Sequence, residues 1–84
     1  MNISVLTPDR TIFEGAIKSV TVPGVGGRFE VLRKHAALVS ALKGGSVLIV
    51  QEDGTRKLFS IEKGFVEVLN DNISLLVQGV TQEI

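Results

Sequence analysis

The sequence predicts an all-β domain, and three observations support this fold class. Apolar and polar residues alternate along several short segments, with the period of two that puts every second side chain on one face of a strand. Turn-forming residues recur about every 8–12 residues, which is typical of a sandwich or a barrel. Helical spacing occurs in one segment only. With 84 residues and no repeat or linker, residues 1–84 are expected to form a single domain.

The first half of the chain contains two clear strand signals. Residues 2–6 put Ile3 and Val5 on one face, and the TPD that follows predicts a turn because proline presets the backbone angle φ. Residues 17–24 (IKSVTVPG) alternate again and end in PG, a strong turn signal. Both segments are therefore expected to be strands that end at turns.

The second half continues the pattern. Residues 46–61 predict a β-hairpin, in which a run rich in β-branched residues leads to a DG turn and alternation resumes after it. The sequence EKG then predicts a corner, FVEVL a strand, NDN a turn and ISLLV a last strand. Residues 35–43 (HAALVSALK) are ambiguous, because Leu38 and Leu42 are spaced for a short helix as well as for a strand.

Composition excludes several classes of protein. Nine basic and nine acidic residues give a formal net charge of zero, whereas nucleic-acid binders usually carry a basic excess. The chain has no cysteine and one histidine, which excludes disulfides, thiolate metal sites and multi-histidine zinc sites. No apolar run is long enough to span a bilayer, and the N-terminus does not resemble a signal peptide. These features predict a soluble domain that faces the cytoplasm and does not insert into the membrane.

The stretch VPGVGGRFEVLRKHAAL combines three glycines with basic residues and the single histidine. A phosphate-binding loop would lead into a helix, but the residues after Gly27 alternate like a strand, so this stretch does not predict a phosphate site. His35 has no accompanying nucleophile signature, which favours an exposed or interface histidine over a general base. An alternative function comes from Lys63, which IEKGF puts at a corner between strands, as in small β-sandwich domains that carry biotin or lipoyl groups. The residues that usually flank a modified lysine are missing.

Taken together, the strands, the glycine turns and His35 resemble the epsilon subunit of the F-type ATP synthase over the whole chain. The family motifs are Phe-x-Gly after the first turn, a Val-x-Val-Pro-Gly turn with a further glycine, Val-Leu-x-x-His-Ala-x-Leu, Ala-Leu-Lys before a glycine, and Gly-Phe-x-Glu-Val with its turn. The matching residues are Phe13, Gly15, Val20, Val22, Pro23, Gly24, Gly27, Val31, Leu32, His35, Ala36, Leu38, Ala41, Leu42, Lys43, Gly45, Gly64, Phe65, Glu67, Val68 and Asn72.

This resemblance implies a two-sheet β-sandwich of about ten short, mostly antiparallel strands, with residues 35–43 as a strand. It implies a central-stalk subunit that couples rotation of the c-ring to the gamma subunit, and hence proton translocation to ATP synthesis. The expected partners are the gamma subunit, the ring of c subunits and, transiently, the alpha/beta head. The subunit is expected to have no catalytic residue, cofactor or metal, and to lie on the cytoplasmic face of the bacterial plasma membrane.

The resemblance also implies two sets of contact residues. Gly26, Gly27, Arg28 and Glu30 are expected to contact the c-ring, and Thr7, His35, Leu38 and Ser40 the gamma subunit. Two of these positions depart from the family, which commonly has an acidic residue in place of Arg28 and a glycine in place of Glu30. The reversed charge leads to the hypothesis that Arg28 meets an acidic or carbonyl-rich loop of the c subunit.

Most members of the family continue past the sandwich into a two-helix hairpin that restrains ATP hydrolysis and in some cases binds ATP. The present sequence ends at Gln82-Glu83-Ile84. It is therefore expected to be a naturally short subunit that has neither the inhibitory arm nor the nucleotide site associated with it.

Overall fold

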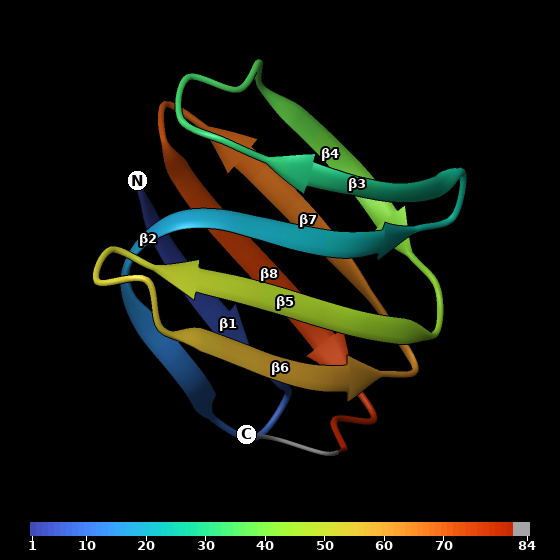
Figure 1. The fold of residues 1–84 in the computed structure, drawn as a ribbon. Helices are drawn as coiled ribbons and strands as arrows, with labels where there is room; N and C mark the ends of the chain where they lie inside the picture. The colour runs from blue at the N-terminus through green and yellow to red at the C-terminus, as the bar shows by residue number, and fades with distance from the viewer. Residues whose placement is uncertain (82–84) are drawn as a thin grey trace.

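A computed structural model describes residues 1–81, and residues 82–84 lie outside the described part of the chain. Residues 1–81 form eight β-strands and no helix, so none of their segments is a helix long and apolar enough to cross a membrane (Figure 1). The strands are β1 (Asn2–Leu6), β2 (Thr11–Gly24), β3 (Gly27–Val31), β4 (Leu38–Leu42), β5 (Gly45–Gln51), β6 (Arg56–Ile61), β7 (Lys63–Leu69) and β8 (Asn72–Gln78).

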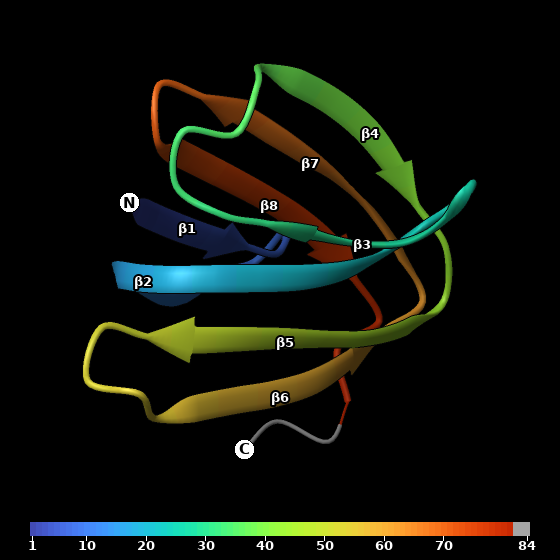
Figure 2. The same ribbon diagram turned by 45° about the horizontal axis from the view of Figure 1, so that its top comes forward.

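The strands form two layers that are joined through the long strand β2. One layer follows the order β1-β8-β7-β4, and the other consists of β3, β2, β5 and β6 (Figures 1 and 2). The first residues of β2 pair with β1, its middle residues pair with β5, and its last residues pair with β3. Every pairing is antiparallel except that between β1 and β8. The predicted all-β sandwich is confirmed, but with eight strands in place of about ten, because β2 runs unbroken for 14 residues.

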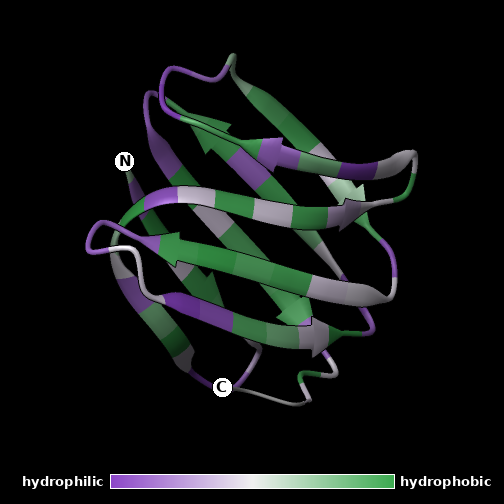
Figure 3. Cartoon of the chain, viewed as in Figure 1, coloured by the Kyte–Doolittle hydropathy of each residue, from purple (hydrophilic) through white to green (hydrophobic). Residues whose placement is uncertain are grey.

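The hydrophobic core lies between the two layers. Alternation along each strand sends one set of side chains inward, as in β8, where Ile73, Leu75 and Val77 are buried and their neighbours are not. Hydrophobic residues follow the strands of both layers, and most hydrophilic ones lie in the connections or on alternate strand positions (Figure 3). The buried hydrophobic residues form one cluster, to which all eight strands contribute. Its members are Ile3, Val5, Ile17, Val20, Val22, Val31, Leu42, Val47, Ile49, Phe59, Ile61, Val66, Val68, Ile73, Leu75 and Val77.

The ambiguous segment forms a strand from residue 38 onward, so the helical alternative is wrong. Residues Leu38–Leu42 pair with β7 over their full length, and this ladder satisfies their backbone hydrogen bonds. Positions four apart share a face in a strand as well as in a helix, because four is a multiple of the strand period. The spacing of the two leucines therefore could not distinguish the two structures. Residues 32–37 precede the strand and are not part of it.

Two of the predicted turns have the backbone geometry that their residues favour. Asn70 and Asp71, between β7 and β8, both have positive φ (51° and 63°), as a two-residue hairpin turn requires. In the turn between β5 and β6, Asp53 Oδ1 accepts hydrogen bonds from the Thr55 hydroxyl (2.6 Å) and the Thr55 amide (2.9 Å). These two bonds favour the ionised carboxylate and lower the pKa of Asp53 below its usual value.

Candidate docking surfaces

The outer face of the β1-β8-β7-β4 layer carries a continuous apolar row. The registers put Leu6 beside Leu76, Leu76 beside Phe65, and Phe65 beside Ala41, so the row crosses all four strands. Phe65 is 56% exposed and Leu76 is 50% exposed. A contiguous apolar patch of this kind on a soluble domain marks an interaction site more often than scattered single residues do.

The row lines an open hollow of about 560 Å³ at the end of β1. Thr7 and Pro8, which follow β1, form one side of it, and Lys63 and Gln78 lie at its edge. The lining is apolar because β8 and β7 carry apolar residues at consecutive positions, so that one points into the core and the next points outward. A segment of another protein could place an apolar side chain here.

A second row on the same face is more polar. Val39 pairs with Glu67, Glu67 with Ser74, and Ser74 with Ser4. The Ser4 hydroxyl in turn donates to the carboxylate of Glu14 on β2, at 3.3 Å. The apolar row is thus bordered on this side by hydroxyl and carboxylate groups.

The glycine-rich turn lies at one end of the sandwich, between β2 and β3. Gly27 has φ of 131°, a backbone conformation that side chains disfavour. Val25 is 61% exposed at the tip. The Arg28 guanidinium does not extend beyond the tip but donates to the backbone carbonyl of Ser46 on β5, at 2.6 Å. This bond holds the Arg28 side chain against the β3-β2-β5-β6 layer.

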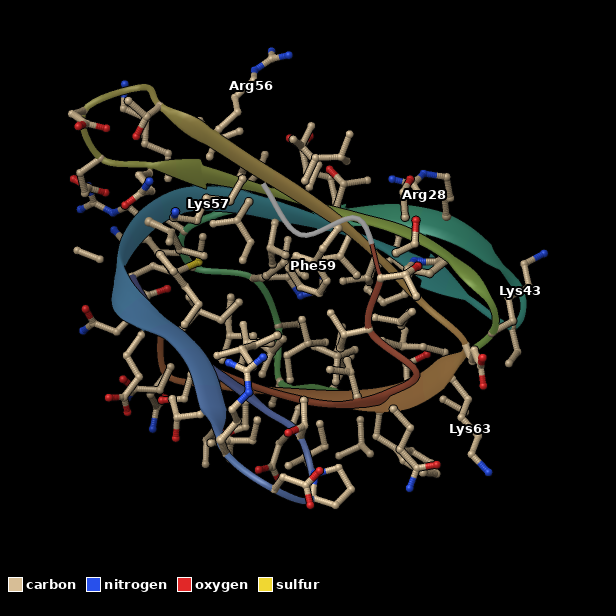
Figure 4. All side chains as sticks on the ribbon, turned by 90° about the horizontal axis from the view of Figure 1, so that it is seen from below. Arg28, Lys43, Arg56, Lys57, Phe59 and Lys63 are labelled. Atoms are coloured by element: carbon tan, nitrogen blue, oxygen red, sulfur yellow. The ribbon has the colours of Figure 1, made fainter. Side chains whose placement is uncertain are left out.

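Two lysines project at the same end as the glycine turn. Lys43 begins the connection from β4 to β5 and donates its amide to the carbonyl of Pro23, while Lys63 begins β7 (Figure 4). Arg56 and Lys57 lie at the opposite end, where the Lys57 Nζ sits 5.7 Å from the centre of the Phe13 ring (Figure 4). The end with the glycine turn therefore combines an exposed valine with basic side chains.

The residues expected to contact the c-ring stay together. Gly26 lies at the tip of the turn and Gly27 begins β3. Arg28 and Glu30 follow on β3, where they pair with Pro23 and Thr21. The residues expected to contact gamma are more dispersed. Thr7 lines the apolar hollow, but Leu38 and Ser40 pair with the buried Val68 and Val66. Their side chains therefore face the inside of β4, and Leu38 packs against the core.

His35 lies far from Thr7 along the sheet, in the connection between β3 and β4. A second hollow, of about 510 Å³, is lined there by Lys34, His35 and the Asn70–Asp71 turn. The Lys34 amide donates to Asp71 Oδ1 at 2.7 Å, and the His35 Nδ1 lies 2.8 Å from the Ala36 carbonyl oxygen. Within residues 1–81, no cluster of three histidine, cysteine or carboxylate side chains could hold a metal ion.

Lys63 does not project from a hairpin tip. It is the first residue of β7, pairs with Gln78 of β8 and borders the apolar hollow. In the carrier alternative, the lysine that receives the biotin or lipoyl group lies at the tip of a hairpin. The position of Lys63 therefore gives no support to the carrier alternative.

The exposed members of the apolar row were not predicted as site residues. Their signal in the sequence is that FVEVL and ISLLV carry apolar residues on both faces of the strand, at Phe65-Val66 and Leu75-Leu76. Strands that are covered on both faces read this way. In a domain with two layers, one of the two apolar faces is left on the outside, which makes it a candidate docking surface.

The fold and these surfaces define a small β-sandwich with an exposed apolar face. Residues 1–83 match the family described as ATP synthase, Delta/Epsilon chain, beta-sandwich domain, and the chain belongs to this family. The resemblance read from the sequence motifs is thereby confirmed.

Known relatives and structures agree with this assignment. The ATP synthase epsilon chain of Campylobacter jejuni is 43% identical over 79 residues, covering 94% of this chain and 61% of the relative. That of Chlorobium limicola is 37% identical over 79 residues, covering 94% of this chain and 90% of the relative. A chain in the mitochondrial ATP synthase of Euglena gracilis (OSCP/F1/c-ring) has the same fold, with a TM-score of 0.87 and 20% identity over 94% of this chain and 51% of its own. The present chain thus spans less than two thirds of the Campylobacter relative.

Proposed function

We propose that this chain is a central-stalk subunit of an F-type ATP synthase, which couples rotation of the c-ring to the gamma subunit and so proton translocation to ATP synthesis. The observation that carries the proposal is the exposed apolar row across β1, β8, β7 and β4, in a chain of the delta/epsilon family. In this role the subunit is bound by the c-ring and the gamma subunit, rotates with them and catalyses no reaction itself. It lies at the cytoplasmic face of the bacterial plasma membrane as a peripheral subunit.

The gamma subunit is the proposed occupant of the apolar row. Phe65 is half exposed beside the hollow, and a large aromatic side chain at the centre of an apolar patch is the usual anchor of a protein interface. Thr7 belongs to this surface because it lines the hollow. His35, Leu38 and Ser40 remain proposed contacts. Because the side chains of Leu38 and Ser40 point inward, we propose that they act by positioning β4 and not by touching the gamma subunit at the centre of the interface.

The c-ring is the proposed partner of the end that carries Gly26 and Gly27. Val25 at the tip is exposed. The apolar row lies on a face, whereas the glycine turn lies at an end. The two partners would therefore bind without competing for the same residues, as coupling between them requires.

Reconstitution tests the function directly. Adding the 84-residue chain to F-type ATP synthase that lacks its epsilon subunit is expected to restore ATP-driven proton pumping, measured as quenching of a pH-sensitive dye in membrane vesicles. The rate of ATP hydrolysis should not be strongly suppressed, because residues 1–81 form β-strands only and supply no helical arm. Failure to bind the complex, or strong suppression of hydrolysis, would contradict the proposal.

Charge reversal at Arg28 tests the contact with the c-ring. We expect Arg28→Glu to reduce proton pumping per ATP hydrolysed, because the reversal repels an acidic or carbonyl-rich loop and removes the bond to Ser46. Rim charges of this kind contribute roughly 0.2–1 kcal/mol each, so the expected loss of affinity is a few-fold. Arg28→Gln is the milder companion, and unchanged pumping and assembly in Arg28→Glu would refute the contact.

A further inference from the structure

The central strand of the apolar face carries opposite charges on the two sides of its aromatic residue. Lys63, Phe65 and Glu67 are alternate residues of β7, so all three point outward, and all three are exposed. The two charges are four positions apart, a distance of about 13 Å along the strand. The apolar row passes between them through Phe65.

Neighbouring residues extend each charge across the face. On the basic side, the register that pairs Leu42 with Gly64 brings Lys43 next to the start of β7, and both lysines project at this end (Figure 4). On the acidic side, the row that runs from the exposed Val39 through Glu67 ends at Ser4, which is bonded to Glu14. The face is therefore basic along one border of the apolar row and acidic along the other.

We propose that these two borders fix the orientation in which the partner docks. The partner presents an apolar ridge to Phe65 and Leu76, with carboxylates over Lys63 on one flank and basic groups over Glu67 on the other. The inference rests on the proposed function, in which the gamma subunit occupies this face. Charges around an apolar contact suppress wrong orientations, because the reversed arrangement brings like charges together.

A second copy of the chain is the main rival occupant. A two-fold axis through Phe65 would bring Lys63 of one copy onto Glu67 of the other, which is self-complementary. Such a pair would stack Phe65 on Phe65 and leave the hollow between Pro8 and Lys63 unfilled. An unlike partner with its own ridge can fill the hollow as well as match the charges.

Exchanging the two charges within β7 tests the orientation. The double variant Lys63→Glu/Glu67→Lys keeps the net charge and changes only its arrangement. At low salt it should bind purified gamma subunit about tenfold more weakly than the wild type, and the difference should shrink as salt screens the charges. The matched control is Glu52→Lys/Arg56→Glu, an exchange of two exposed charges at the β5–β6 hairpin on the far end, which should change the affinity by less than about twofold.

The outcomes separate the inference from the function on which it rests. If the wild type binds gamma and the exchanged variant binds equally well, the orientation inference is overturned and the function stands. If the wild type does not bind gamma, both fall. If the wild type forms dimers through this face and the exchanged variant dimerises equally, the face is an interface between copies, since the exchange preserves self-complementarity, and the inference is again overturned. If the double variant melts at a lower temperature than the wild type, the single variants Lys63→Gln and Glu67→Gln replace it. Each is expected to bind the gamma subunit about threefold more weakly, and unchanged affinity in both would overturn the inference.

Discussion

Replacing Phe65 by glutamate is expected to abolish binding to the gamma subunit while the domain stays folded. The side chain is 56% exposed and points away from the core, so its loss removes little of the packing that stabilises the sandwich. The same change removes the aromatic anchor of the apolar row and buries a charge against the partner. Such anchors contribute about 2–4 kcal/mol, which corresponds to roughly a 30- to 1,000-fold loss of affinity.

Titration calorimetry with purified gamma subunit measures this loss, and thermal melting checks the fold. The matched control is Leu58→Glu, because Leu58 is a 41% exposed apolar residue on β6, in the other layer. It introduces the same charge into an outward strand position away from the apolar row, and its affinity should stay near that of the wild type. An equal loss in both variants, or full affinity in Phe65→Glu, would show that the β1-β8-β7-β4 face is not the gamma site.

The fold could be predicted largely from alternation and turn residues, but the length and continuity of the strands could not. Local patterns identify the strand signal of residues 17–24, whereas the structure extends this strand back to Thr11 because β1 supplies hydrogen-bond partners for the additional residues. Partners of this kind come from tertiary structure, which a local window does not contain. The same limit left residues 35–43 open in the local pattern, whereas the family resemblance implied a strand, and the ladder with β7 forms one at Leu38–Leu42.

The candidate site was predicted only in part, for a related reason. The glycine turn is a local feature, so its position could be predicted from the PG signal and from the motif that contains Gly24 and Gly27. The apolar row consists of single residues from four separate strands, and only the register between strands brings them together. Arg28 illustrates a further limit, since its charge is visible in the sequence but its bond to Ser46, eighteen positions away, is not.

At Gly64, the residue next to Phe65, even one added methyl group should destabilise the fold. Gly64→Ala is expected to destabilise the domain by about 3 kcal/mol, because a methyl group at this position would overlap the backbone carbonyl of Leu76 and approach Val77 Cγ1 to 3.1 Å. Backbone atoms cannot move aside as a flexible side chain can, so β7 and β8 would have to separate locally. In a domain of this size the change should lower the melting temperature by roughly 12–24 °C, measured by circular dichroism.

Gly26→Ala is the matched control for this substitution. Gly26 has no positive φ, and a methyl group there would meet no atom within 4 Å, so its effect on stability should stay within about 0.5 kcal/mol. Comparing the two variants separates the loss of stability caused by the close approach of β7 and β8 from the loss caused by replacing any glycine. It also connects the fold with the docking face, because the separation of β7 and β8 sets the spacing between Phe65 and Leu76. If Gly64→Ala melts like the wild type, the two strands are not held together as closely as the geometry requires, and the apolar row has no fixed spacing for a partner to match.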